Sequence, residues 1–180
     1  DKSKSFINIR KVSNITFLNI GINHSYFLQG FITDNVTSIE PSPTTLTLEK
    51  ISFSNYNPYG IISQNIDLSG NFLTWKNLIN AEIHLRDCAF SDFEVKGNSS
   101  LIYMTSGNNF NITSCIFNNI ESFAENESYA FMIKIQDPQE NIKASLQNLT
   151  FMNSKILGSA SFIDLNSNIT LTDITFDENQ

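Results

Sequence analysis

The sequence predicts an all-β fold of the β-solenoid class, in which short strands coil around one axis. A ten-residue pattern recurs six times along the chain, its apolar residues alternate with other residues, and signals for helices are nearly absent. Recurrence every 20 to 50 residues, roughly, is typical of solenoids, and alternation is typical of strands with one buried face. At 180 residues the chain fits one domain, residues 1–180, or one segment of a longer array.

Each copy of the pattern reads apolar, any, apolar, two polar, apolar, any, Phe, any, then Asn or Asp. The copies are RKVSNITFLN (10–19), LTLEKISFSN (46–55), IHLRDCAFSD (83–92), FNITSCIFNN (110–119), ASLQNLTFMN (144–153) and ITLTDITFDE (169–178). Only Arg10 and Glu178 depart plainly from it. The two adjacent polar positions interrupt the alternation of apolar residues, which predicts two short strands that meet at a bend. The Asn after the Phe predicts a corner, because Asn tolerates left-handed backbone angles and can bond to nearby backbone.

A third apolar stretch lies upstream of most copies, which predicts three short strands per repeat and about five to six rungs of a β-solenoid. These stretches are YFLQ (26–29), LIYM (101–104), AFMIKI (130–135) and SFIDL (161–165). The Pro- and Ser-rich segment 40–45 and the long stretch 65–82 are expected to be loops that enlarge the second and third rungs.

Stacking of the copies predicts columns of equivalent residues. The inward Phe of each copy is expected in one continuous core ladder of rings, made of Phe17, Phe53, Phe90, Phe117, Phe151 and Phe176. Charges at the bend test the register: Glu49 falls beside Arg86 and Lys50 beside Asp87, about 4.8 Å apart along the axis. Both pairs are complementary, which favours parallel stacking in this register.

The TF-x-N words, with short apolar strands such as SFIDL before them, resemble the right-handed parallel β-helix (pectin-lyase-like) repeats of secreted surface proteins. Such proteins include bacterial polymorphic outer-membrane proteins and many surface proteins of unicellular eukaryotes. The resemblance covers nearly the whole chain and implies a right-handed parallel β-helix. The Gly-Gly-Ala-Ile word of the bacterial repeats is missing here, and SYAF (128–131) and SASF (159–162) are the nearest approach.

The chain has two cysteines, Cys88 and Cys115, at the same inward position of neighbouring copies. Stacking would place their α-carbons about 4.8 Å apart, within the range that permits a disulfide. Two buried thiols packed as small apolar groups are the alternative. No metal site is expected, because no His or third Cys falls in the same inward column.

Eight Asn-X-Ser/Thr triplets are candidate N-glycosylation sites in a chain with 24 Asn residues. They begin at Asn14, Asn23, Asn35, Asn98, Asn111, Asn126, Asn148 and Asn168. At Asn14 and Asn148 the alternation turns Asn and Thr outward and the middle residue inward, so a glycan would leave the core undisturbed. Outward Thr is also a good strand former, which is the alternative explanation of every triplet.

The net charge is −7, from 11 Lys and Arg against 18 Asp and Glu, and there is no basic cluster. Nucleic acids and anionic membranes require concentrated basic residues, so neither is an expected partner. No apolar run comes near the roughly 18 residues that a membrane-spanning helix needs, so no membrane insertion is expected.

Enzymatic activity is not expected, although β-helices host polysaccharide lyases and hydrolases. Their sites need two or three converging acidic groups, whereas the outward positions here are mostly hydroxyl and amide. The one charged cluster neutralises itself and consists of Glu49, Lys50, His84, Arg86 and Asp87. No Ser-His-Asp or Cys-His spacing indicates a nucleophile. The sequence therefore predicts no catalytic residue, no cofactor and no metal.

Neither end of the sequence shows a capping helix, so either the chain is cut from a longer β-helix or its open edges pair with other copies. The predicted function is that of an extracellular or cell-surface structural glycoprotein. Its partners would be N-linked glycans and further copies of itself, stacked head to tail into a filament, unless it forms the shaft of a surface protein.

The alternative function is that of a surface adhesin whose long loops, 21–45 and 56–82, bind a carbohydrate or a cell-surface protein. Aromatic platforms for such a ligand would be Trp75 and either Tyr56 or Tyr59.

Overall fold

The computed structural model describes the chain in residues 7–9, 14–23, 32–34, 44–54, 73–75, 81–96, 100–105, 109–124, 131–136, 142–158, 160–166 and 168–180. Every regular element in these ranges is a β-strand, which confirms the predicted all-β class. All of the strand pairs between these described residues run parallel. No helix in these ranges has the length and apolar character needed to cross a membrane.

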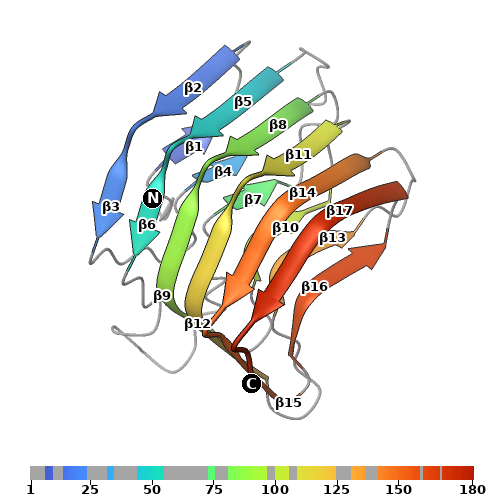
Figure 1. Ribbon diagram of the computed structural model, residues 1–180. Coiled ribbons are helices and arrows are strands. Elements are labelled where there is room, and N and C mark those ends of the chain that lie inside the picture. The colour runs from blue at the N-terminus through green and yellow to red at the C-terminus, as the bar shows by residue number, and fades with distance from the viewer. Residues whose placement is uncertain are drawn as a thin grey trace, which may run out of the picture.

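The described strands form two parallel sheets, one of six strands and one of eleven. The smaller sheet contains one short strand from each repeat, and its strands lie in chain order. Its strands are β1 (Ile7–Ile9), β4 (Ile32–Asp34), β7 (Leu73–Trp75), β10 (Ser100–Met104), β13 (Phe131–Gln136) and β16 (Ser161–Asn166). Figure 1 shows this sheet behind the larger one.

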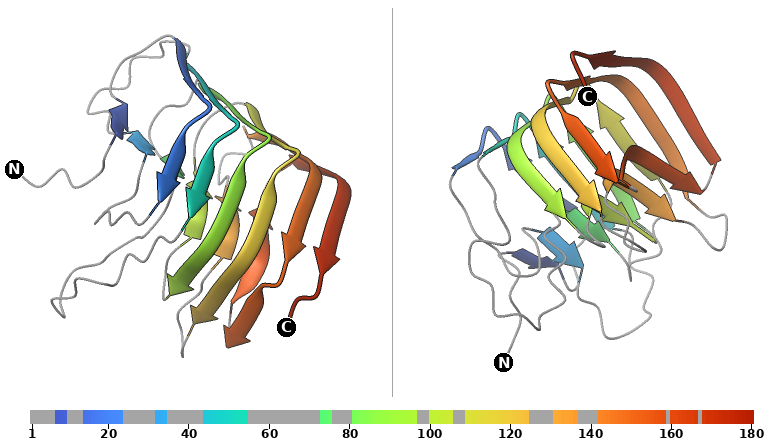
Figure 2. Two further views of the ribbon diagram at one scale, coloured as in Figure 1. Left: turned by 60° about the vertical axis from the view of Figure 1, so that its left-hand side comes forward. Right: turned by 90° about the horizontal axis from the view of Figure 1, so that it is seen from below.

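The larger sheet has two limbs that are joined by long strands near the C-terminus. The first limb contains β2 (Asn14–Leu18), β5 (Thr44–Glu49), β8 (Ala81–Arg86) and β11 (Asn109–Thr113). The second limb contains β3 (Gly21–Asn23), β6 (Ser52–Ser54), β9 (Ala89–Lys96), β12 (Ile116–Ala124) and β15 (Lys155–Gly158). Two strands, β14 (Lys143–Met152) and β17 (Asn168–Asp177), run through both limbs. The sheet curls into a half-barrel, as Figure 2 shows, which is compatible with a β-solenoid.

Left-handed residues make the bends between these limbs. The first bend is occupied in successive repeats by Asn19, Lys50, Asp87, Ser114, Asn148 and Asp173, with φ between 52° and 55°. A second bend, after the Phe, is formed by Asp92, Asn119, Asn153 and Glu178, with φ between 49° and 59°. Asn and Asp dominate both sets because their short polar side chains tolerate this conformation. The predicted corner after the Phe is therefore confirmed in these four repeats.

The register also agrees with the predicted columns over most of the chain. Glu49 is the strand partner of Arg86, as the bend charges indicated. Lys50 and Asp87 occupy the same bend position, and each backbone N–H donates to the following repeat, at 3.0 Å and 3.1 Å. The core lies inside these columns, where residues such as Leu85 and Ile112 are fully buried.

The predicted place of Phe17 in the ladder is wrong. Phe17 pairs with Leu48 in the first limb, and Ile22 stands beside Phe53 in the Phe column. The word around Phe17 fits either limb, because both limbs alternate with the same period of two. The frame is set by Asn19, which takes the left-handed conformation of the first bend and is followed by the apolar Ile20 and Ile22.

Two predicted loops contain strands. Strand β7 lies within 65–82 and β8 begins inside the same range, while β3 and β4 lie within 21–45. Strand β5 begins at Thr44, so the last two residues of the predicted loop 40–45 are strand as well. Strands β3, β4 and β7 have three residues each, and a run of three gives too little alternation to distinguish a strand from a loop. The predicted strand at 26–29 lies outside the described residues, as do residues 40–43 of the Pro-rich segment.

Candidate functional site

The last strand of the larger sheet leaves apolar side chains uncovered. Leu171 and Phe176 on β17 are 50% and 53% exposed. Their partners one repeat earlier, Leu146 and Phe151, are completely buried. Within the described part of the chain, β17 pairs only with β14. We call the outer side of β16 and β17 the C-terminal edge.

The opposite side of the larger sheet has the same character. Strands β2 and β3 form what we call the N-terminal edge, and they pair only with β5 and β6 among the described strands. The inward residues of this edge, Ile15, Phe17, Ile20 and Ile22, are only partly buried against the core. Both edges therefore present backbone groups and apolar side chains that interior strands cover with a neighbour.

A stack of aromatic rings leads to the C-terminal edge. The ring centroids of Phe90 and Phe117 are 5.1 Å apart, those of Phe117 and Phe151 4.8 Å, and those of Phe151 and Phe176 5.2 Å. The interplanar angles are 12° to 14°, so the rings lie nearly parallel. Phe162 of the smaller sheet packs at a tilt against the last two rings. Apart from Phe17, the predicted ladder is thus in register through Phe53 to Phe176.

Amide side chains connect successive repeats outside the core. The Nδ2 of Asn119 donates to Oδ1 of Asp92 at 2.7 Å, and that of Asn153 donates to Oδ1 of Asn118 at 2.9 Å. Two further amide donors are Asn148, to Oγ of Ser114 at 3.1 Å, and Asn109, to Oε1 of Glu82 at 3.1 Å. In all four bonds the amide of the later repeat donates to an oxygen of the earlier repeat. The predicted corner after the Phe includes Asp92, Asn119 and Asn153, but it did not include the other members of these bonds or their common direction.

The two cysteines stack in neighbouring repeats and are free thiols, both buried. Their strands are linked where the Ile116 N–H donates to the Cys88 carbonyl at 2.9 Å. The hydrogen bond between the two thiols raises the pKa of Cys115, and burial raises it further. The same hydrogen bond lowers the pKa of Cys88. Of the two alternatives from the sequence, the structure has packed thiols in place of a disulfide.

Four of the candidate glycosylation residues have exposed side chains: Asn14, Asn23, Asn148 and Asn168. Asn148 lies at the left-handed bend, and Leu149 beside it is buried, as the alternation predicted. Asn111 is half-buried, with Nδ2 at 3.2 Å from Nδ1 of His84. The other three candidates, Asn35, Asn98 and Asn126, lie outside the described residues.

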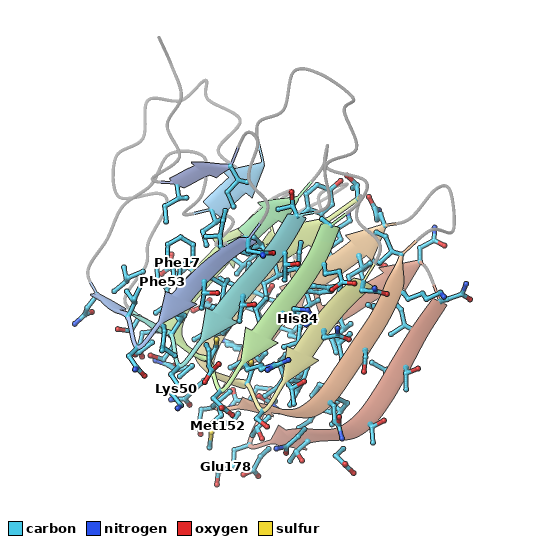
Figure 3. All side chains as sticks on the ribbon, turned by 90° about the horizontal axis from the view of Figure 1, so that it is seen from above. Phe17, Lys50, Phe53, His84, Met152 and Glu178 are labelled. Atoms are coloured by element: carbon cyan, nitrogen blue, oxygen red, sulfur yellow. The ribbon has the colours of Figure 1, made fainter. Side chains whose placement is uncertain are left out.

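The charged cluster lies on the outer surface of the larger sheet. Figure 3 shows His84 on this face and Lys50 at the bend. Lys50 Nζ is 3.7 Å from Oε1 of its neighbour Glu49, and His84 Nε2 is 3.9 Å from Oε2 of Glu82. In the described ranges, no group of three or more His, Cys, Asp or Glu side chains could hold a metal ion.

A hollow of about 630 Å³ lies at the second bend near the C-terminus. Its lining is mostly amide and charged, and includes the three bend residues Asn119, Asn153 and Glu178. Several of these side chains form hydrogen bonds to neighbouring repeats, so their polar groups stabilise the stacking of the repeats.

Of the aromatic residues predicted as platforms for an adhesin ligand, Trp75 ends β7 in the smaller sheet, and Tyr56 and Tyr59 lie outside the described residues.

One buried hydroxyl in the described part of the chain lacks a hydrogen-bond partner. The Ser122 hydroxyl is fully buried and has no hydrogen-bond partner among the described residues. Its strand partners are the apolar residues Val95 and Ile156. Because apolar side chains flank it on both sides, we interpret this hydroxyl as a local packing defect and not as part of a ligand-binding site.

In comparisons with known proteins, the chain matches no family model, no curated protein and no solved structure.

Proposed function

We propose that the chain is an extracellular structural glycoprotein, a right-handed parallel β-helix of five to six rungs. It acts as a filament subunit that stacks head to tail, or as the shaft of a surface protein. The observation that carries this proposal is the exposure of Leu171 and Phe176 in columns whose earlier members, Leu146 and Phe151 among them, are completely buried.

Physical chemistry favours covering this edge with another parallel strand. Each exposed apolar area of about 100 Å² that becomes buried contributes about 2.5 kcal/mol. Added strands also satisfy the backbone groups of an open edge, and a head-to-tail contact continues indefinitely when each subunit carries both surfaces. A structural element that grows by repetition uses this kind of surface, whereas a catalytic site needs convergent reactive groups.

Glycans on the outer face would keep such filaments apart. The exposed Asn148 and Asn168 begin acceptor triplets whose middle residues turn inward, so an attached sugar would project away from the core. N-glycosylation takes place in the secretory pathway, which is why the proposal includes an extracellular or cell-surface location.

Electron microscopy of the purified protein over a range of concentrations tests the filament proposal. The expected result is unbranched fibres with an axial repeat of about 29 Å, because the smaller sheet has six strands spaced about 4.8 Å apart. Particles that stay monomeric at every concentration would refute filament formation.

Secretion from eukaryotic cells, followed by enzymatic deglycosylation and mass spectrometry, tests the glycoprotein part. Loss of one glycan in an Asn148→Gln variant is the expected result. A matched Asn153→Gln variant changes an exposed bend Asn outside any acceptor triplet, so it should keep every glycan. A secreted protein without any sugar would contradict this part of the proposal.

A further inference from the structure

The N-terminal and C-terminal edges match each other in sequence and in backbone shape. Residues 14–23 read NITFLNIGIN and residues 168–177 read NITLTDITFD. The pairing of strands through the whole sheet places Asn14 and Asn168 in one column and Ile22 and Phe176 in another. Four of the ten aligned residues are identical, and every inward position is apolar in both segments.

The apolar side chains of the two edges fit one another by position. With the columns continued across a junction, Phe17 of one copy would lie on the half-exposed Leu171 of another. In the same way Ile22 would lie on the ring of Phe176, as Ile22 lies beside Phe53 within the chain. The apolar side chains of the N-terminal edge of one copy would therefore cover those exposed at the C-terminal edge of the other copy.

The polar groups at the bend also continue across such a junction. Asn19 and Asp173 have the same φ of 55° and both are exposed. At this first bend within the chain the later repeat donates and the earlier repeat accepts, as Nδ2 of Asn148 donates to Oγ of Ser114. At the second bend an amide donates to a carboxylate in the same direction, from Asn119 to Asp92. The N-terminal edge has the amide, Asn19, and the C-terminal edge has the carboxylate, Asp173, so the same bond can form between copies.

Backbone hydrogen bonds at the first bend also share one direction, which is opposite to that of the side-chain amides: here the earlier repeat donates to the later one. The Asn19 N–H donates to the Glu49 carbonyl at 3.1 Å, and the Ser114 N–H donates to the Gln147 carbonyl at 3.0 Å. Each bend N–H thus donates to the residue before the bend of the following repeat. At the junction the Asp173 N–H would meet the carbonyl of Leu18 from the other copy.

From these matches we infer that residues 14–23 of one copy pair in parallel with residues 168–177 of a second copy, with Thr16 opposite Thr170. This inference depends on the proposed filament, and it specifies the partner and the register of the contact. The partner is another copy of the chain because one molecule carries both complementary surfaces.

Engineered disulfide cross-linking tests the register directly. Thr16 and Thr170 are exposed, so Thr16→Cys/Thr170→Cys should fold, and its two α-carbons would be about 4.8 Å apart across the junction. The matched control, Thr16→Cys/Thr172→Cys, moves one cysteine by two residues and separates the α-carbons by about 8 Å, beyond the reach of a disulfide. Unglycosylated protein is used, with Cys88 and Cys115 left in place.

After mild oxidation, non-reducing electrophoresis should show a ladder of covalent oligomers for the first variant and monomer for the control. Peptide mapping should join position 16 to position 170. Equal ladders in both variants, or a ladder only in the control, would overturn the inferred register while the filament proposal stands. Fibres in the microscope without any cross-link would have the same meaning. Failure of wild-type protein to associate would refute both.

Two further variants test the surface without cysteines. Leu171→Asp puts a charge into the inferred contact, and light scattering should show self-association weakened by at least about tenfold. Thr172→Asp adds the same charge to the neighbouring outward position, which is also exposed, and should weaken association far less. Equal association by both variants would contradict the inferred contact, provided that circular dichroism shows native folding for each.

Discussion

Replacement of Phe117 by Ala is the strongest test of the aromatic stack. Phe117 is fully buried, and its ring lies between Phe90 at 5.1 Å and Phe151 at 4.8 Å. Truncation of a buried Phe to Ala costs about 3–5 kcal/mol, and each lost ring pair is worth about 0.5–1.5 kcal/mol, part of which is already included. We therefore expect the free energy of unfolding to fall by about 4–5 kcal/mol.

The matched control is Phe176→Ala. The Phe176 side chain is 53% exposed and stacks in parallel on one ring only, that of Phe151. Because about half of its area already contacts water, the expected loss is about 2 kcal/mol. The same residue type in the same column should therefore differ by roughly twofold in cost.

Urea denaturation followed by far-ultraviolet circular dichroism and by tryptophan fluorescence measures both losses. Coincident transitions with the two probes would support a cooperative unfolding reaction. If Phe117→Ala costs no more than Phe176→Ala, the rings do not form the continuous core described above, and the assignment of columns fails.

Variants at three more positions test local features of the fold. Ser122→Val removes a buried hydroxyl without a partner and should raise the free energy of unfolding by about 1 kcal/mol; a loss in urea denaturation would contradict the assigned burial. At the left-handed Lys50, the Gly variant should be about 1 kcal/mol more stable than the Ala variant, and equal midpoints would argue against φ of 54°. Above pH about 9, unfolded Cys115 ionises while the native thiol keeps its proton, because its pKa is raised by Cys88 and by burial. The native state then binds more protons, so stability should fall with rising pH, and fall less in Cys115→Ala; equal slopes would refute this linkage.

The sequence could predict the elements whose columns repeat closely. Phe90, Phe117 and Phe151 recur at the same position of the pattern, so their stacking followed from its period. The complementary bend charges of Glu49 and Arg86 also predicted the register between the second and third copies of the pattern. Phe17 could not be placed in this way, because a period of two fits either limb. Its frame depends on the backbone conformation of Asn19, which Asn permits but does not require.

The candidate site was harder to predict from residue types. Leu146 and Leu171 are the same residue at the same position of the pattern, yet one is buried and the other is half exposed. They differ because Leu146 has a neighbouring strand on both sides, whereas Leu171 has one on one side only among the described strands. The number of neighbouring strands depends on the arrangement of the whole sheet and not on the residue type. The common direction of the hydrogen bonds from Asn side chains could not be predicted either, because residue types alone do not show which repeat supplies the donor.

The spacing between stacked Phe residues varies, from 25 residues between Phe151 and Phe176 to 37 between Phe53 and Phe90. The axial advance, by contrast, is one strand spacing of about 4.8 Å for each repeat, whatever the length of the connection. Gene duplication or deletion of a whole repeat would therefore change the length of the molecule in fixed steps. Insertions between strands would enlarge the loops around the axis and leave the axial length unchanged. A protein built in this way can therefore keep a fixed length while the sequences of its surface loops change.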